Sequence, residues 1–226
     1  DLFGDKPDGL FIVRDIGKGK TILLTSGAAT NAALGQALGN LLRPLGVTPP
    51  VTISDAKGKC VATPTLYRDG RAMLVPFNAL SQRSWGTVQV QLPAPAWCYL
   101  ADEGRYLGYT DRPAIAASET LRYRVLVGLP YEVTRLDATQ RREAGRAQRL
   151  RFKLATRGAK PGNHVVRLTV TGPDGQERAC YAANLTLTGG RGEHVVPLAL
   201  NDPHGAWTVM ATDVATGVRA QVTWND

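Results

Sequence analysis

The stretch VLVGLPYEVTRL, residues 125–136, separates two parts of the sequence that differ in pattern. Gly128 and Pro130 interrupt an apolar run, and Tyr131 begins a new alternation of polar and apolar residues, which is typical of a half-buried strand. Upstream of this stretch, strand-like runs are mixed with one helical pattern, and downstream only strand-like runs occur. We therefore expect two structural modules to be joined here.

The region downstream, residues 130–226, has the pattern of a β-sandwich. Strand-like runs recur at short intervals and are separated by turn residues such as Gly172-Pro173-Asp174-Gly175, where proline presets φ and glycine accepts a positive value. We predict an immunoglobulin-like or fibronectin-like sandwich. Its expected strands are residues 131–136, 150–155, 164–171, 177–187, 192–198, 205–213 and 218–224.

Residues 51–129 are expected to form a small antiparallel β module. Asp69-Gly70 stands between two strand-like runs, 60–66 and 71–77, and this dipeptide favours a tight hairpin turn. The run TVQVQL, residues 87–92, alternates cleanly, and residues 121–127 close the module as a last strand. The protein is therefore predicted to be mainly β.

Residues 1–50 carry the one helical pattern, so we expect a short α/β unit at the N-terminus. Two strands, 10–16 and 21–25, flank the turn Gly17-Lys18-Gly19-Lys20, and a helix is predicted within residues 26–46. The GKGK turn lacks the spacing of a phosphate-binding loop and is followed by a strand instead of a helix, so a hairpin is favoured.

The order of these motifs resembles the C-terminal region of bacterial β-galactosidase-like glycoside hydrolases. Arg14, the GKGK turn and the helix ending in Leu45-Gly46-Val47 resemble the end of their flavodoxin-like trimerisation domain, and Arg68-Asp69-Gly70 resembles the small β domain that follows it. Gly205-Ala206-Trp207-Thr208-Val209 before an Asp-x-x-Thr-Gly turn is similar to accessory immunoglobulin-like domains of extracytoplasmic bacterial proteins.

The resemblance implies three domains, 1–50, 51–129 and 130–226, in a non-catalytic accessory or assembly region of a larger protein. The catalytic carboxylates of that family lie in a barrel domain, which this sequence does not contain. The partner would be the rest of the parent polypeptide or another chain, a homo-oligomer is allowed, and an extracytoplasmic location is expected. An alternative is a carbohydrate-binding or adhesion module.

Four aromatic residues are candidates for carbohydrate binding: Trp97, Tyr99, Tyr106 and Tyr109. Trp97 and Tyr99 are two positions apart in a strand-like run, so they share a face. Exposed rings would form a platform for sugar rings, whereas buried rings would be core residues whose polar tips find partners. Both interpretations remain open at this point.

A basic run between residues 135 and 153 is the densest charge in a chain whose net charge is +8. The candidate residues for an anionic-polymer patch are Arg141, Arg142, Arg146 and Arg149. The alternative is an edge strand whose charges prevent pairing with other sheets. No aromatic residue is interleaved with these arginines, so nucleic acid is disfavoured as the partner.

The sequence shows no catalytic, metal or cofactor motif. His164, His194 and His204 have no cysteine or carboxylate at the spacing of metal ligands, and no nucleophile-elbow motif occurs. The cysteines Cys60, Cys98 and Cys180 are distant and odd in number, so no disulfide framework is expected. No apolar run approaches the roughly 20 residues that span a bilayer.

Overall fold

The computed structural model describes residues 11–24, 40, 42–47, 51–54, 60–62, 65–66, 73–79, 86–116 and 123–226. The chain divides into two compact units, Asp1–Pro49 and Pro50–Asp226. The two modules expected at 51–129 and 130–226 thus lie within one unit.

The first unit contains an antiparallel hairpin of β1 (Phe11–Ile16) and β2 (Gly19–Leu24). Gly17, at a φ of 59°, lies in the turn, because a tight hairpin turn requires the positive φ that glycine accepts readily. The hairpin is formed as predicted, but its turn is shorter than the GKGK sequence, because Gly19 and Lys20 already belong to β2.

The helix expected in this unit lies almost wholly outside the described residues, so the α/β character is not shown. The described residues nearest its end include the 3₁₀ helix η1 (Arg43–Leu45). Gly46 follows η1 at a φ of 75° and donates its N–H to the Arg43 carbonyl, which ends the helical turn.

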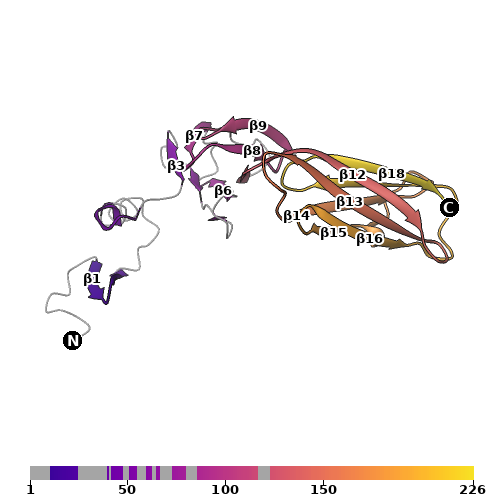
Figure 1. Cartoon of the computed structure of the whole chain (residues 1–226), viewed down its shortest axis with the longest axis horizontal. Helices are drawn as coiled ribbons and strands as arrows, with labels where there is room; N and C mark the ends of the chain where they lie inside the picture. Colours follow the sequence, from indigo (N-terminus) through magenta and orange to yellow (C-terminus); the bar gives the residue numbers. More distant parts are fainter. Residues whose placement is uncertain are drawn as a thin grey trace. The chain divides into compact units, whose positions relative to one another are not determined.

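The small β module is formed by two antiparallel sheets. One has the order β10-β7-β3 and the other the order β4-β6-β11-β8-β9, with β5 also paired to β6 (Figure 1). The strands are β3 (Thr52–Ser54), β4 (Cys60–Ala62), β5 (Thr65–Leu66), β6 (Met73–Ala79), β7 (Thr87–Gln91), β8 (Ala96–Leu100), β9 (Arg105–Thr110), β10 (Ala114–Ala116) and β11 (Tyr123–Leu129).

The predicted hairpin at Asp69-Gly70 joins β5 and β6, which pair antiparallel, while the turn itself lies outside the described residues. Alternate residues of β7 and β8 point inward and form a compact core together with Leu126 of β11. Val88, Val90, Cys98 and Leu100 in this core are buried. Burial raises the pKa of the Cys98 thiol to about 12, so Cys98 acts as a small core residue.

The C-terminal region is a β-sandwich of two antiparallel sheets, β12-β13-β16 and β15-β14-β17-β18 (Figure 1). Its strands are β12 (Glu132–Arg142), β13 (Ala147–Arg157), β14 (His164–Thr171), β15 (Ala183–Leu187), β16 (Arg191–Pro197), β17 (Ala206–Asp213) and β18 (Arg219–Asn225). Each predicted run overlaps one of these strands, and the sandwich is confirmed. β15 pairs with β14 and not with β16, which is the fibronectin-like arrangement.

Two strand boundaries differ from the prediction by six residues, and the other differences are smaller. β12 continues to Arg142, six residues beyond the predicted end at 136. Residues 137–142 are mostly polar and show no strand pattern of their own, but they pair with β13. The expected strand 177–187 begins only at Ala183, since Ala179–Tyr181 form the 3₁₀ helix η2.

Candidate functional site at the joint of the two β modules

The joint between the small β module and the sandwich is the part of the molecule where predicted site residues, buried polar groups and cavities meet. β11 ends at Leu129 and β12 starts at Glu132, with Pro130 between them. The two faces of β11 serve different cores: Leu126 belongs to the core of the small module, whereas Val127 and Leu129 belong to the sandwich core. The sandwich core thus continues into the small module.

Tyr99 of β8 also links the small β module to the sandwich. Its side chain is only 2% exposed, and its hydroxyl accepts a hydrogen bond of 2.9 Å from the backbone N–H of Val133 in β12. Burial raises the pKa of Tyr99 to about 12, so the phenol is neutral at physiological pH. A tyrosine that was predicted either as a platform or as a core residue is therefore a core residue with a satisfied hydroxyl.

Two turns approach each other at the same joint. Gly104 follows β8, Gly217 lies between β17 and β18, and both have positive φ, 61° and 75°. A Cβ atom on Gly217 would lie 2.3 Å from the Cα atom of Gly104, so no larger residue fits unless one backbone moves. Sequence analysis identified the Asp-x-x-Thr-Gly turn but could not place its contact with Gly104.

A chain of buried hydrogen bonds lies behind this turn. Tyr131 Oη and His164 Nε2 are 2.9 Å apart, and His164 Nδ1 lies 2.9 Å from Asp213 Oδ1. Thr216 donates its hydroxyl to Asp213 Oδ2 over 2.5 Å. Asp213 accepts from the Nδ1–H tautomer of His164, which leaves Nε2 as the acceptor for the Tyr131 hydroxyl.

This network resembles a catalytic relay in composition, but its side chains are almost fully buried. His164 and Asp213 are 4% and 0% exposed, and the Tyr131 hydroxyl also accepts the N–H of Gly162 over 2.8 Å. The groups are satisfied by each other, which is what a buried polar network needs to stabilise a fold. The 49-residue separation of His164 and Asp213 explains why their pairing was missed in the sequence.

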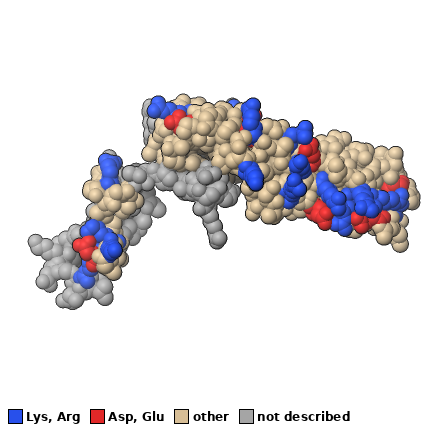
Figure 2. All heavy atoms as spheres, in the orientation of Figure 1, with Lys and Arg blue, Asp and Glu red and all other residues tan. Residues whose placement is uncertain are grey.

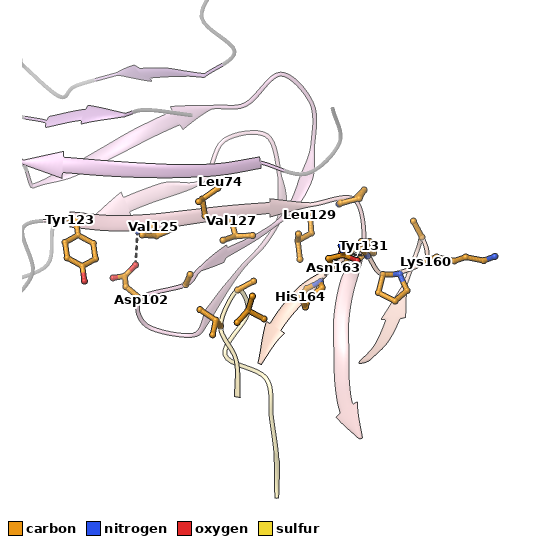
Figure 3. Close-up of a pocket in the computed structure, with 18 residues that line it drawn as sticks. Leu74, Asp102, Tyr123, Val125, Val127, Leu129, Tyr131, Lys160, Asn163 and His164 are labelled. Atoms are coloured by element: carbon orange, nitrogen blue, oxygen red, sulfur yellow. Dashed lines mark hydrogen bonds between the residues drawn. The ribbon is translucent and has the colours of Figure 1, made fainter. Parts of the chain in front are cut away.

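A cavity of about 860 Å³ opens on one side of the joint (Figure 3). Figure 3 shows Leu74, Val125 and Val127 along its middle, Asp102 with Tyr123 at one end, and Lys160 with Asn163 at the other. Two of the polar groups at its ends are already engaged: Asp102 Oδ1 accepts from the N–H of Val125 over 3.0 Å, and Asn163 Oδ1 accepts from the N–H of Gly189. The cavity can therefore take an apolar group. Tyr131 and His164 also line it, and both take part in the buried hydrogen-bond network described above.

The other carboxylate oxygen of Asp102 faces a buried cation. Asp102 Oδ2 lies 2.7 Å from Nε of Arg124, whose side chain is 2% exposed, and Glu103 Oε1 accepts from the same guanidinium. Removing one partner of such a buried pair leaves an uncompensated charge, which costs more than the pair itself contributes. Asp102 thus has a structural role at the edge of the cavity.

The four predicted aromatic residues are brought together on one face of β8 and β9. Trp97 packs on Tyr109 with ring centroids 4.4 Å apart, and Tyr99 packs on Tyr106 at 5.1 Å. Tyr106 and Tyr109 are 46% and 57% exposed, whereas Trp97 is partly buried and Tyr99 is buried. The inner pair therefore supports an outer pair whose rings reach solvent.

The predicted basic residues are distributed differently. Arg146 is 10% exposed and donates to the carbonyl groups of Ala199 at 2.7 Å and Asp202 at 2.9 Å, as well as to the carboxylate of Asp226. Its guanidinium holds the β12–β13 turn to the loop that connects β16 to β17 and is not free for an external anion. This role was not visible in the sequence, because the acceptors are backbone groups 53 and 56 residues away.

The remaining arginines of the run lie at the surface among acidic residues. Arg149 bonds Glu143 and Glu193 at 2.6 and 2.5 Å, Arg142 lies 3.9 Å from Asp226, and Arg141 is exposed. Figure 2 shows basic and acidic side chains interleaved on this part of the sandwich. An anionic-polymer patch at Arg141, Arg142 and Arg149 stays a prediction.

Among the described residues, no group of three histidine, cysteine or acidic side chains is placed to hold a metal ion. Within the same part of the chain, no helix is long and apolar enough to cross a membrane.

Comparisons with known proteins give weak similarity in structure only. No family model matches the sequence, and no curated protein matches it. A solved structure described as a "putative beta-galactosidase" from Bacteroides fragilis aligns with 77% of this chain at 12% identity and a TM-score of 0.26. The match covers 35% of that chain, so this protein spans about a third of its length.

We predict that Tyr99→Phe lowers the free energy of unfolding by about 1–3 kcal/mol, because the N–H of Val133 loses its acceptor inside the joint. The matched control is Tyr109→Phe, which removes the hydroxyl of an exposed ring and should change stability by less than about 0.5 kcal/mol. Urea unfolding of the three proteins measures both values. Equal stability of the two variants would contradict the role given to Tyr99.

Arg146→Ala is expected to cost about 2–4 kcal/mol, since it leaves the buried carboxylate of Asp226 without its main partner. Arg141→Ala, on the adjacent exposed surface, should cost less than about 0.5 kcal/mol. Thermal unfolding of both variants checks the difference. A fully stable Arg146→Ala protein would show that this arginine belongs to the surface after all.

Proposed function

We propose that this chain is a non-catalytic accessory region of a larger bacterial protein related to glycoside hydrolases. The observation that carries the proposal is the core shared by the small β module and the sandwich. Val127 and Leu129 of β11 and Tyr99 of β8 belong to the same buried cluster as Trp207 of β17. A shared core of this kind holds two modules as one body, as a spacer or presenting arm requires.

The placement of polar groups supports a structural role for the joint. His164, Asp213 and Asp102 are titratable groups at the joint whose side chains are largely removed from solvent. In each case the side chain is engaged by another group of the protein at 2.9 Å or less, or by a backbone N–H at 3.0 Å. Groups held in this way stabilise the joint.

Assembly and location belong to the same proposal. Support for an oligomerising N-terminal unit comes from the motif around Arg14 and the GKGK turn, which resembles the end of a trimerisation domain. An extracytoplasmic setting is supported by the resemblance of the sandwich sequence to accessory domains of extracytoplasmic bacterial proteins. The parent polypeptide, or another copy of this chain, is the proposed partner.

The chain is expected to release no nitrophenol from nitrophenyl β-galactoside or β-glucoside above the buffer rate. Glycoside hydrolysis requires two carboxyl groups roughly 5–10 Å apart on either side of the bond, and the proposal assigns these groups to another domain. The measurement is absorbance over several hours with micromolar protein. Hydrolysis that co-purifies with the chain through two independent purification schemes would overturn the proposal.

A further inference from the structure

We propose that the face formed by Trp97, Tyr106 and Tyr109 binds a neutral polysaccharide, with the sugar rings stacked on the two exposed tyrosines. This goes beyond an accessory role, because it assigns a ligand class and a site. The site lies on β8 and β9, on the side of the small module that faces the sandwich.

The first support is a β-bulge that aims both tyrosines at the same face. Side chains three positions apart on a regular strand point to opposite faces, so Tyr106 and Tyr109 would be separated by the sheet. The register shifts between Cys98, which pairs with Gly108, and Tyr99, which pairs with Tyr106. The additional residue on β9 is Leu107, which packs against the core of the small module. Bulges of this kind re-aim side chains and are common beside functional sites.

Glycine allows this bulge to form. Gly108 has a φ of 111°, a conformation that is strained for other residues. Its partner Cys98 belongs to the core of the small module, so Leu107 and Gly108 together face one residue of β8. The local geometry thus places two aromatic rings on one face where a regular strand would place one.

The second support is that the exposed rings are held from below. Tyr109 rests on Trp97 and Tyr106 rests on Tyr99, and Tyr99 is fixed by the N–H of Val133. Trp97 in turn lies against Gly158, where a Cβ atom would be 3.1 Å from the indole ring. Rings that are already ordered lose little conformational entropy on binding, which favours affinity.

The third support is the polar surroundings of Tyr106. Glu132 and Arg157 form an ion pair across β12 and β13. Glu132 lines a cavity of about 220 Å³ together with Tyr106 and Gly217. Partial burial, and then the charge of Glu132, raise the pKa of Tyr106, whereas the charge of Arg157 lowers it. A carboxylate and a guanidinium beside an aromatic face can bond the hydroxyl groups of a sugar while its apolar C–H face covers the ring.

The ligand class follows from these groups. Exposed aromatic rings can bury apolar area when a ligand binds, and they carry no charge. The charges of Glu132 and Arg157 offset each other at the edge of the site. A neutral pyranose polymer has both an apolar ring face and hydroxyl groups, so it satisfies the rings and the ion pair together. A strongly anionic polymer would instead be drawn to exposed arginines such as Arg141 and would bind in a salt-dependent way.

The test is affinity electrophoresis of the full chain through gels containing soluble β-glucan, galactan, xyloglucan or polygalacturonate. We expect retardation in at least one neutral gel, and about tenfold weaker binding for Tyr106→Ala and for Tyr109→Ala. The matched control is Tyr123→Ala, which removes a 49% exposed tyrosine from β11 and should bind as the unaltered chain does. Circular dichroism of each variant verifies folding.

Three results would overturn the proposal. One is the absence of retardation in every neutral gel, and another is unchanged binding by a folded Tyr106→Ala, Tyr109→Ala double variant. The third is retardation by polygalacturonate alone, abolished by salt, which would assign binding to the arginine surface. None of these results bears on hydrolysis of nitrophenyl glycosides, so the site and the accessory role fail separately.

Discussion

The hydrogen bond from the N–H of Val133 to the hydroxyl of Tyr99, inside a core shared by two modules, is the contact on which the arrangement depends. It joins β8 of the small module to the first strand of the sandwich. Val127 and Leu129 belong to the same buried cluster as Tyr99 and Val133, and the bond itself is buried. Because a buried N–H without an acceptor is costly, the two modules are stabilised in one relative position.

That position has consequences on both sides of the joint. On one side, Gly104 and Gly217 approach so closely that neither accepts a side chain, and the small cavity beside Tyr106 forms next to them. On the other side, residues of β11 line the larger cavity, which has Asp102 at one end. The buried bonds of His164 and Asp213 hold the sandwich end of the joint. A rigid arm carrying an aromatic binding face is a consistent account of these features.

Much of the sandwich could be predicted from the sequence, because alternation and turn residues are local signals that each strand carries by itself. β14, for example, matches the predicted residues 164–171. The extension of β12 to Arg142 was missed, since its last residues are polar and gain their structure from pairing with β13. The aromatic residues were identified in the sequence. Their common face could not be predicted, because it depends on the register of pairing between β8 and β9, which shifts near Leu107. Arg146 was predicted to lie in an anionic-polymer patch, but it donates to backbone carbonyls that are distant in the sequence.

The most direct test of the joint is the stability of Gly217→Ala compared with Gly175→Ala. Both glycines have nearly the same φ, 75° and 76°, so the backbone strain of alanine is matched. A Cβ atom on Gly175 would meet no other atom within 4 Å, whereas a Cβ atom on Gly217 would meet Gly104 at 2.3 Å. We predict that Gly217→Ala unfolds in urea with a free energy about 2 kcal/mol lower than that of Gly175→Ala. Equal stability of the two variants would contradict a tightly packed joint.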